Sequence, residues 1–221
     1  MGEFLLDHEP LIRIGIFAAI LALMAGGEVL APRRRQAIGR ITRWPSNLGI
    51  VALNSLLLRL LFPAAAVGFA GFAAAHGWGL FNALAVPYWF AAVASVLLLD
   101  LTIYLQHVMF HAVPAFWRLH RMHHADLEFD VTTALRFHPL EILLSMVIKL
   151  AAVAVLGPPP VAVLVFEVLL NGTSMFNHGN LRLPASLDRV LRQILVNPDM
   201  HRVHHSVLPH ETNSNFGFNL P

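Results

Sequence analysis

The chain has 221 residues, of which 57% are hydrophobic and only 13% are charged, and its mean hydropathy is +0.63. A soluble domain carries about 25% charged residues, so this composition excludes an ordinary cytosolic enzyme, a disordered tail and a secreted mini-protein. The chain has no cysteine, which excludes a disulfide framework, a thiolate-bound iron–sulfur cluster and a zinc finger. The formal charge is +2, but no basic helix is interleaved with aromatic residues, and we expect no nucleic-acid partner.

Five apolar segments predict membrane-spanning helices. They cover residues 11–31, 54–75, 86–105, 140–156 and 161–176. The last two are separated only by Gly157 and three prolines, which predicts a helical hairpin that dips into or crosses the bilayer. The predicted fold is therefore all-α, an integral membrane bundle of about four to five spans.

Basic residues directly after the first apolar segment predict the orientation of the chain. A loop with five arginines is typical of the cytoplasmic side: Arg33, Arg34, Arg35, Arg40 and Arg43. With that loop inside, ten of the thirteen histidines fall just beyond membrane-helix ends on the same side. The prediction therefore adds a cytosolic, histidine-rich helical cap to the bundle.

The composition also indicates where the protein resides. Lys149 is the single lysine among fifteen Lys and Arg residues, a bias that we interpret as that of a GC-rich bacterial genome, and we expect the bacterial inner membrane. The N-terminus lacks the positive region of a signal peptide, so the first span is expected to be retained. We expect one integrated unit, with membrane spans in 1–99 and the histidine-bearing domain in 100–221.

Two opposite charges in the hairpin predict an ion pair. Lys149 lies about 12 Å from the hairpin turn and Glu167 about 10.5 Å from it, at 1.5 Å per residue. An isolated lysine at mid-membrane costs about 2.5–3.5 kcal/mol on insertion scales. Pairing removes much of that cost, and the alternative is that each side chain reaches its own interface.

Three histidine clusters dominate the chain. They are a HxxxH pair and two copies of H-R-x-H-H: His107 and His111; His120, His123 and His124; His201, His204 and His205. Chance gives two HxxHH copies with a probability of order 0.001. On a helix, spacings of three and four put imidazoles on one face, where a triplet can serve two neighbouring ions. Pro114 and the sequence Asn197-Pro198-Asp199 are typical helix starts.

Single histidines complete the candidate ligand set. His138 and His178 stand at the two ends of the hairpin, so we expect both at the same membrane surface as the clusters; the alternative is an ordinary interfacial cap. His8, His76 and His210 are expected to have ordinary structural roles. Ten candidate ligands suit two six-coordinate ions with about two positions open.

The ligand chemistry favours iron, with carboxylates as supporting groups. Structural zinc needs about four ligands, whereas a cage of imidazoles with open positions suits two non-haem iron ions; zinc can replace iron in isolated protein. Five carboxylates near the clusters are candidates for orienting ring N–H groups, or alternatively are solvated or hydrogen-bonding charges: Asp100, Asp126, Asp130, Glu141 and Asp199.

Other protein classes fit the pattern less well. A metal-binding or metal-transport protein without oxidase activity would place its ligands within the spans along a path. A bis-histidine haem protein needs one histidine on each facing helix at membrane depth. A zinc hydrolase would show H-E-x-x-H, which is absent.

With these motifs, the stretch 100–219 resembles the sterol desaturase / fatty acid hydroxylase superfamily of membrane di-iron enzymes. The matching sequence words are DLTIYLQHVMFH, HRMHH, RFHPLE, NHGN, NPDMHRVHH and NFGFNLP. The resemblance implies a cytosol-facing di-iron site with metal-ligand roles for all ten histidines named above. It also implies O2 as oxidant, hydroxylation or desaturation of a lipid or sterol-like substrate, and electrons from a ferredoxin- or cytochrome-type carrier with its reductase.

Two positions depart from the family's pattern. Val108 stands where many members have arginine, and the sequence ends at Pro221, before a segment with Trp, Asp, Phe and Gly that usually follows. The substrate-binding residues are not evident from the sequence, because an apolar tunnel carries no distinctive side chains.

Overall fold

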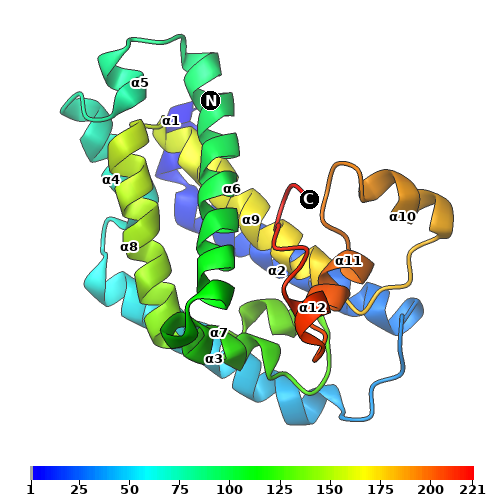
Figure 1. Ribbon diagram of the computed structural model, residues 1–221. Helices are drawn as coiled ribbons and strands as arrows, with labels where there is room; N and C mark the ends of the chain where they lie inside the picture. The colour runs from blue at the N-terminus through cyan, green and yellow to red at the C-terminus, as the bar shows by residue number, and fades with distance from the viewer. Residues whose placement is uncertain (1) are drawn as a thin grey trace.

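The computed structural model describes residues 2–221, in which helices are joined by loops (Figure 1). The helices are α1 (Gly2–Asp7), α2 (Glu9–Leu30), α3 (Arg40–Leu61), α4 (Ala65–Ala75), α5 (Leu80–Ala83), α6 (Tyr88–Ala112), α7 (Pro114–His124), the 3₁₀ helix η1 (Val131–Leu135), α8 (Pro139–Leu156), α9 (Pro160–Asn177), α10 (Ala185–Leu191), α11 (Pro198–His204) and α12 (Pro209–Thr212). Within residues 2–221 there is no β-strand, only a single bridge between Pro32 and Leu181. The all-α prediction is confirmed.

Five segments of the described chain are long and apolar enough to cross a membrane. They are Glu9–Leu30, Arg40–Ala83, Tyr88–Ala112, Pro139–Leu156 and Pro160–Asn177. Large side chains on their outer faces are exposed, for example Leu23 and Leu30 of α2, at 73% and 86%. Lipid solvates such a surface without cost, so the protein is an integral membrane protein.

The second membrane segment differs from its predicted form. Its helix α3 begins at Arg40 rather than near residue 54, and the chain breaks at Phe62–Ala64 before α4. Pro63 has no N–H to continue the helix, which explains the break. The early start has an electrostatic reason, because Arg40 and Arg43 form ion pairs with carboxylates on other elements and are not part of a free loop.

Helix α6 is also longer than predicted, and this corrects the position of the first histidine pair. It extends to Ala112 and ends where Pro114 begins α7. His107 and His111 therefore lie in the last two turns of a membrane helix, not beyond its end. Figure 1 shows α7, α11 and α12 gathered at the end of the bundle where α6 ends.

The α8–α9 hairpin forms as predicted. Gly157 ends α8 at φ +65°, and a Cβ there would lie 2.4 Å from the carbonyl oxygen of Trp78, so only glycine fits. The predicted ion pair is confirmed, with Lys149 Nζ 2.5 Å from Glu167 Oε1. Arg13 of α2 is a second cation on Glu167, at 2.6 Å, which the sequence did not reveal.

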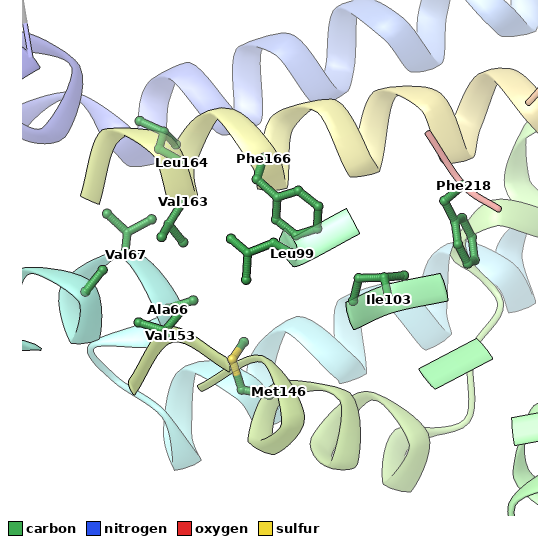
Figure 2. Packing of buried hydrophobic residues seen from close by; sticks show 11 residues of the cluster. Ala66, Val67, Leu99, Ile103, Met146, Val153, Val163, Leu164, Phe166 and Phe218 are labelled. Atoms are coloured by element: carbon green, nitrogen blue, oxygen red, sulfur yellow. The ribbon is translucent and has the colours of Figure 1, made fainter. Parts of the chain in front are cut away.

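The buried core joins the hairpin to α4 and α6. Leu99 and Ile103 of α6 lie in one cluster with Val163 and Phe166 of α9 (Figure 2). Phe218, near the C-terminus, belongs to the same cluster. The core therefore fixes both the end of α6 and the C-terminal segment, the two parts of the chain between which the histidines lie.

Candidate metal centre

Nine of the ten predicted ligands converge in two groups. In each group one ring nitrogen from every member lies within 4.8 Å of the others. The first group is His107, His111, His120, His124 and His204, and the second group is His123, His178, His201 and His205. Both groups are composed of imidazoles alone. Metal ligation by these residues is a prediction that rests on this geometry.

Helix periodicity explains how each motif divides between the groups. On α7, His120 and His124 are four residues apart and join the first group, while His123 turns to the second. On α11 the division is reversed, since His201 and His205 join the second group and His204 joins the first. The prediction that one triplet serves two neighbouring positions agrees with this arrangement.

Several ring nitrogens of different histidines lie within hydrogen-bond distance of one another. Nε2 of His107 is 3.1 Å from Nε2 of His120, and Nε2 of His178 is 3.0 Å from that of His123 and 3.1 Å from that of His201. Such pairs need a shared proton or a shared cation. Metal–nitrogen bonds of about 2.1 Å at right angles put neighbouring ligand nitrogens about 3.0 Å apart, so the spacing fits a metal ion.

Unpartnered nitrogens give the same result. Buried Nε2 atoms of His111, His204 and His205 have no hydrogen-bond partner within the described chain, nor does either ring nitrogen of His124. Leaving a buried polar atom without a partner costs about 1–3 kcal/mol. Metal ions in both groups would satisfy these atoms, and the donor set is the one that zinc, iron and similar ions take.

Hydrogen bonds on the opposite ring edge hold the imidazoles in place. Nδ1 of His107 donates to the carbonyl of Phe216, and Nδ1 of His204 to that of Ser214, both at 2.8 Å. Because a carbonyl only accepts, Nδ1 carries the proton and Nε2 presents its lone pair to the group. His178 Nδ1 donates at 2.7 Å to the Ser174 carbonyl in its own helix.

Two side chains add to this support. Nδ1 of His120 donates to Glu141 Oε1 at 2.6 Å, and Nδ1 of His111 lies 3.3 Å from Asn213 Oδ1. Glu141 is thus the one acidic candidate from the sequence that contacts a histidine among the described residues, and it lies on α8, the helix that begins at Pro139.

Burial keeps the rings neutral. It lowers the pKa of His178 to about 3. Burial first, and then repulsion by neighbouring imidazoles, puts the pKa values of His123, His201 and His205 well below the ordinary value of 6.5. A neutral imidazole is the form that binds a metal.

His138 belongs to neither group and has the alternative role considered for it, that of a helix cap. Its Nδ1 accepts a hydrogen bond from the backbone N–H of Leu140 at 3.1 Å, so the ring caps the N-terminus of α8. A proline follows at the first helical position, and capping leaves the ring at the helix start, away from the groups. His8 and His76 bond to carbonyls in their own helices and have the ordinary roles expected of them.

The other four carboxylates do not form hydrogen bonds with the histidine rings. They have the alternative role considered for them, that of charges paired with other groups. Asp126 and Asp130 each accept a hydrogen bond from Arg43 at 2.7 Å, and Asp199 pairs with Arg33 and Arg202 on the surface. Although burial opposes it, hydrogen bonds from Thr132 and the charge of Arg43 hold the pKa of Asp130 below its ordinary value. An arginine within reach is the stronger partner for a carboxylate, which explains the difference.

Asp100 contacts no histidine directly, but it holds the C-terminal segment that contacts them. Its Oδ1 accepts from Asn219 Nδ2 at 2.7 Å and its Oδ2 from the Leu220 N–H at 3.3 Å. Asn219 also accepts from Thr173 Oγ1 at 2.6 Å. The carboxylate therefore anchors the segment 213–220, which supplies the acceptors for His107, His111 and His204. Sequence reasoning missed these acceptors because every residue has a backbone carbonyl.

A cavity of about 590 Å³ opens beside the histidines. Its walls include His111 and His124 from the first group, His205 from the second, and Trp117 of α7. A molecule in this cavity would contact rings of both groups.

Two groups of buried and half-buried imidazoles thus lie at the ends of membrane helices, an arrangement that could hold metal ions. Residues 92–221, more than half of the chain, match the family model for fatty acid hydroxylases, and the chain belongs to the fatty acid hydroxylase family.

A curated relative supports the same assignment. The chain is 27% identical over 134 residues to ornithine lipid hydroxylase OlsE of Rhizobium tropici, covering 61% of this chain and 40% of the relative. The chain thus spans about two fifths of the length of that relative. No solved structure matches the present chain significantly.

Proposed function

We propose that the protein is a membrane-bound lipid hydroxylase that uses O2 and two non-haem iron ions. The observation that carries the proposal is the convergence of nine imidazoles in two groups within 4.8 Å, with buried nitrogens left unpartnered. Both the family and the curated relative are hydroxylases by name, which supports hydroxylation over desaturation.

The chain's own residues have three tasks in this proposal. The first group would hold one ion and the second group the other, and the ions would supply the oxidising power for attack on an unactivated C–H bond. Glu141 and the carbonyls of Ser214 and Phe216 keep the rings aimed inward. The buried second group excludes water from the centre, since His123, His178 and His201 have no exposed surface.

The substrate and the electron donor follow from the same argument. The relative acts on ornithine lipid by name, and the groups lie where α6 leaves the membrane, so we propose an amphiphilic lipid as the substrate. None of the motifs found in the sequence is typical of a flavin or nicotinamide site, and we propose that electrons come from a ferredoxin- or cytochrome-type carrier.

The contacts of the basic segment support a cytoplasmic centre in the bacterial inner membrane. Arg33 pairs with Asp199 of α11 at 3.0 Å, and the backbone N–H of Arg33 donates to the Asn180 carbonyl at 2.9 Å. The arginine-rich segment and the histidine groups thus share one side of the protein. If arginines stay in the cytoplasm, so do the histidines.

The test is expression in an iron-supplemented bacterium with a ferredoxin and its reductase, followed by lipid mass spectrometry and metal analysis. We expect lipids heavier by one oxygen atom, about two irons per chain, and no Soret band. His204→Ala should abolish the oxidised lipid and reduce bound iron. His76→Ala, at a histidine outside both groups, is the matched control and should leave both unchanged.

Two outcomes would contradict the proposal. Oxidised lipid that persists in His204→Ala would make the histidines bystanders. Bound metal without any oxidised lipid, together with metal uptake into vesicles that contain the protein, would favour the transport alternative.

A further inference from the structure

The cavity beside the histidine groups has an unusual charge. Arg118 and Arg121 lie on its wall, one turn apart on α7, and no aspartate or glutamate lines it. Within residues 2–221 neither guanidinium has a side-chain hydrogen bond or ion pair, whereas most other arginines of the chain do. Like charges one turn apart destabilise a helix by a few tenths of a kcal/mol, so the pair has no evident structural role.

The rest of the lining is suited to a small amphiphile. Trp117, Met122 and Val207 give the cavity apolar surface close to the arginines. Trp117 also packs against two rings of the first group in a tilted arrangement, with its ring centroid 4.9 Å from that of His111 and 5.3 Å from that of His124. A molecule that fills the cavity would therefore touch members of both histidine groups on one side and two cations on another.

We propose that this cavity binds the anionic end of an amphiphile, a phosphate or carboxylate, between Arg118 and Arg121. Guanidinium groups form paired, charge-assisted hydrogen bonds with such anions. The arginines line a concave space of about 590 Å³, which is the size of a ligand pocket and not of a protein-docking face. The identification of this amphiphile as the substrate, held by its head group, rests on the proposed function.

Binding of a soluble probe tests the site without catalysis. Hexyl phosphate, hexanol and inorganic phosphate are titrated calorimetrically into the full chain in neutral detergent, first without metal and then with redox-inert zinc. We expect hexyl phosphate to bind more tightly than inorganic phosphate, because Trp117 and Val207 contact its chain, and far more tightly than hexanol. Arg118→Gln together with Arg121→Gln should weaken hexyl phosphate binding at least about tenfold, which equals 1.4 kcal/mol.

The matched control removes the same charge elsewhere. Arg34 and Arg35 are exposed neighbours away from the cavity, so Arg34→Gln with Arg35→Gln should leave the affinity within about twofold. Arg118→Lys with Arg121→Lys should retain part of the binding, since the charge remains while the paired geometry is lost.

Each result has a defined meaning. Equal affinity for hexyl phosphate and hexanol, or an equal loss in the control variant, would overturn the anion site. Inorganic phosphate binding as tightly as hexyl phosphate would make the ligand a free anion and overturn the amphiphile. Oxidised lipid without anion binding would overturn this inference alone, whereas anion binding in a protein that never oxidises lipid would leave the site standing and overturn the proposed function.

Discussion

The two histidine groups are close neighbours but are held in place by different means. In the first group, His107, His111 and His204 take their Nδ1 contacts from residues 213–216. In the second group, His178 bonds to Ser174, one turn back in its own helix. The first group lines the cavity with two half-buried rings, whereas the second group lines it with His205 alone and its other three rings are fully buried.

This difference predicts separate roles for the two positions. A closed site mainly retains its metal, and an open site admits a ligand. The first group is the one whose geometry depends on a distant part of the chain, so it should be the more easily disturbed. Selective perturbation of one group or the other tests this directly.

Removing a residue from the more deeply buried second group should have the largest effect. His201→Ala takes a fully buried member from the second group, and we expect bound metal to fall from about two ions per chain to about one, because outer contacts alone change affinity 10–100-fold and a direct ligand exceeds that. Plasma mass spectrometry after chelator washing measures the content. Retention of both ions would show that the second group is not a metal position.

Acid should destabilise the metal-free protein strongly, and the second group should contribute to this loss. The folded-state pKa values of His123, His201 and His205 are depressed and that of His178 is about 3, against about 6.5 in the unfolded chain. The unfolded chain therefore binds more protons below pH 6.5. Stability that is fully present above pH 6.5 is lost as pH falls toward 3, by about 1.4 kcal/mol per pH unit for each such histidine.

Thermal unfolding of the apoprotein at pH 7.5, 6.5 and 5.5 measures this slope. His178→Gln should reduce the pH dependence of stability by the contribution of one histidine, about 1.4 kcal/mol per pH unit. An unfolding temperature that is constant from pH 7.5 to 5.5 would contradict the buried, neutral state of the second group.

Releasing the C-terminal segment should weaken the first group alone. Asp100→Asn removes one of the two acceptors that hold Asn219 and Leu220. We expect the first group to lose up to about 100-fold in metal affinity, while the second group keeps its ion. The visible spectrum of bound Co²⁺, titrated against a chelator, resolves the two affinities.

An exchanged pair provides the rescue. In Asp100→Asn combined with Asn219→Asp, an amide and a carboxylate again face each other, and Thr173 still finds an acceptor at residue 219. Recovery of the first-group affinity supports an anchoring role for Asp100. Equal weakening of both groups by Asp100→Asn would instead indicate general destabilisation.

The smallest effect is expected from the single carboxylate that contacts a ring. Glu141→Leu leaves Nδ1 of His120 without the acceptor now at 2.6 Å, and we expect first-group affinity to fall about tenfold. Glu141→Gln keeps an acceptor oxygen and should retain most of the affinity. Chelator competition measures both variants, and an equal loss in the two would show that charge, rather than ring orientation, matters.

How much of this the sequence predicts depends on the kind of signal. Apolar length predicts the membrane helices, and helical spacing predicts the convergence of His120, His123 and His124 with the α11 triplet. Depth arithmetic predicts the contact between Lys149 and Glu167, because only one opposite charge lies at that level of the hairpin. These signals depend on side-chain type and local period, and both can be read along one chain.

The remainder depends on tertiary contacts that leave no mark on composition. The start of α3 at Arg40 follows from ion pairs of Arg40 with Glu28 and of Arg43 with Asp126, both outside α3. The acceptors for His107 and His204 are carbonyls, which are identical at every residue. His138 and His178 look alike in sequence, and only the fold places one at a helix cap and the other among the rings.

The reversed division of α7 and α11 between the groups has a mechanical consequence. His123 and His124 are adjacent on one helix yet face different centres, as do His204 and His205. The offset between the two histidine groups is therefore set by helical rise and rotation, about 1.5 Å and 100° per residue, on two helices at once. Neither group can shift without moving its neighbour, so the spacing between the two groups would survive thermal motion of the surrounding bilayer.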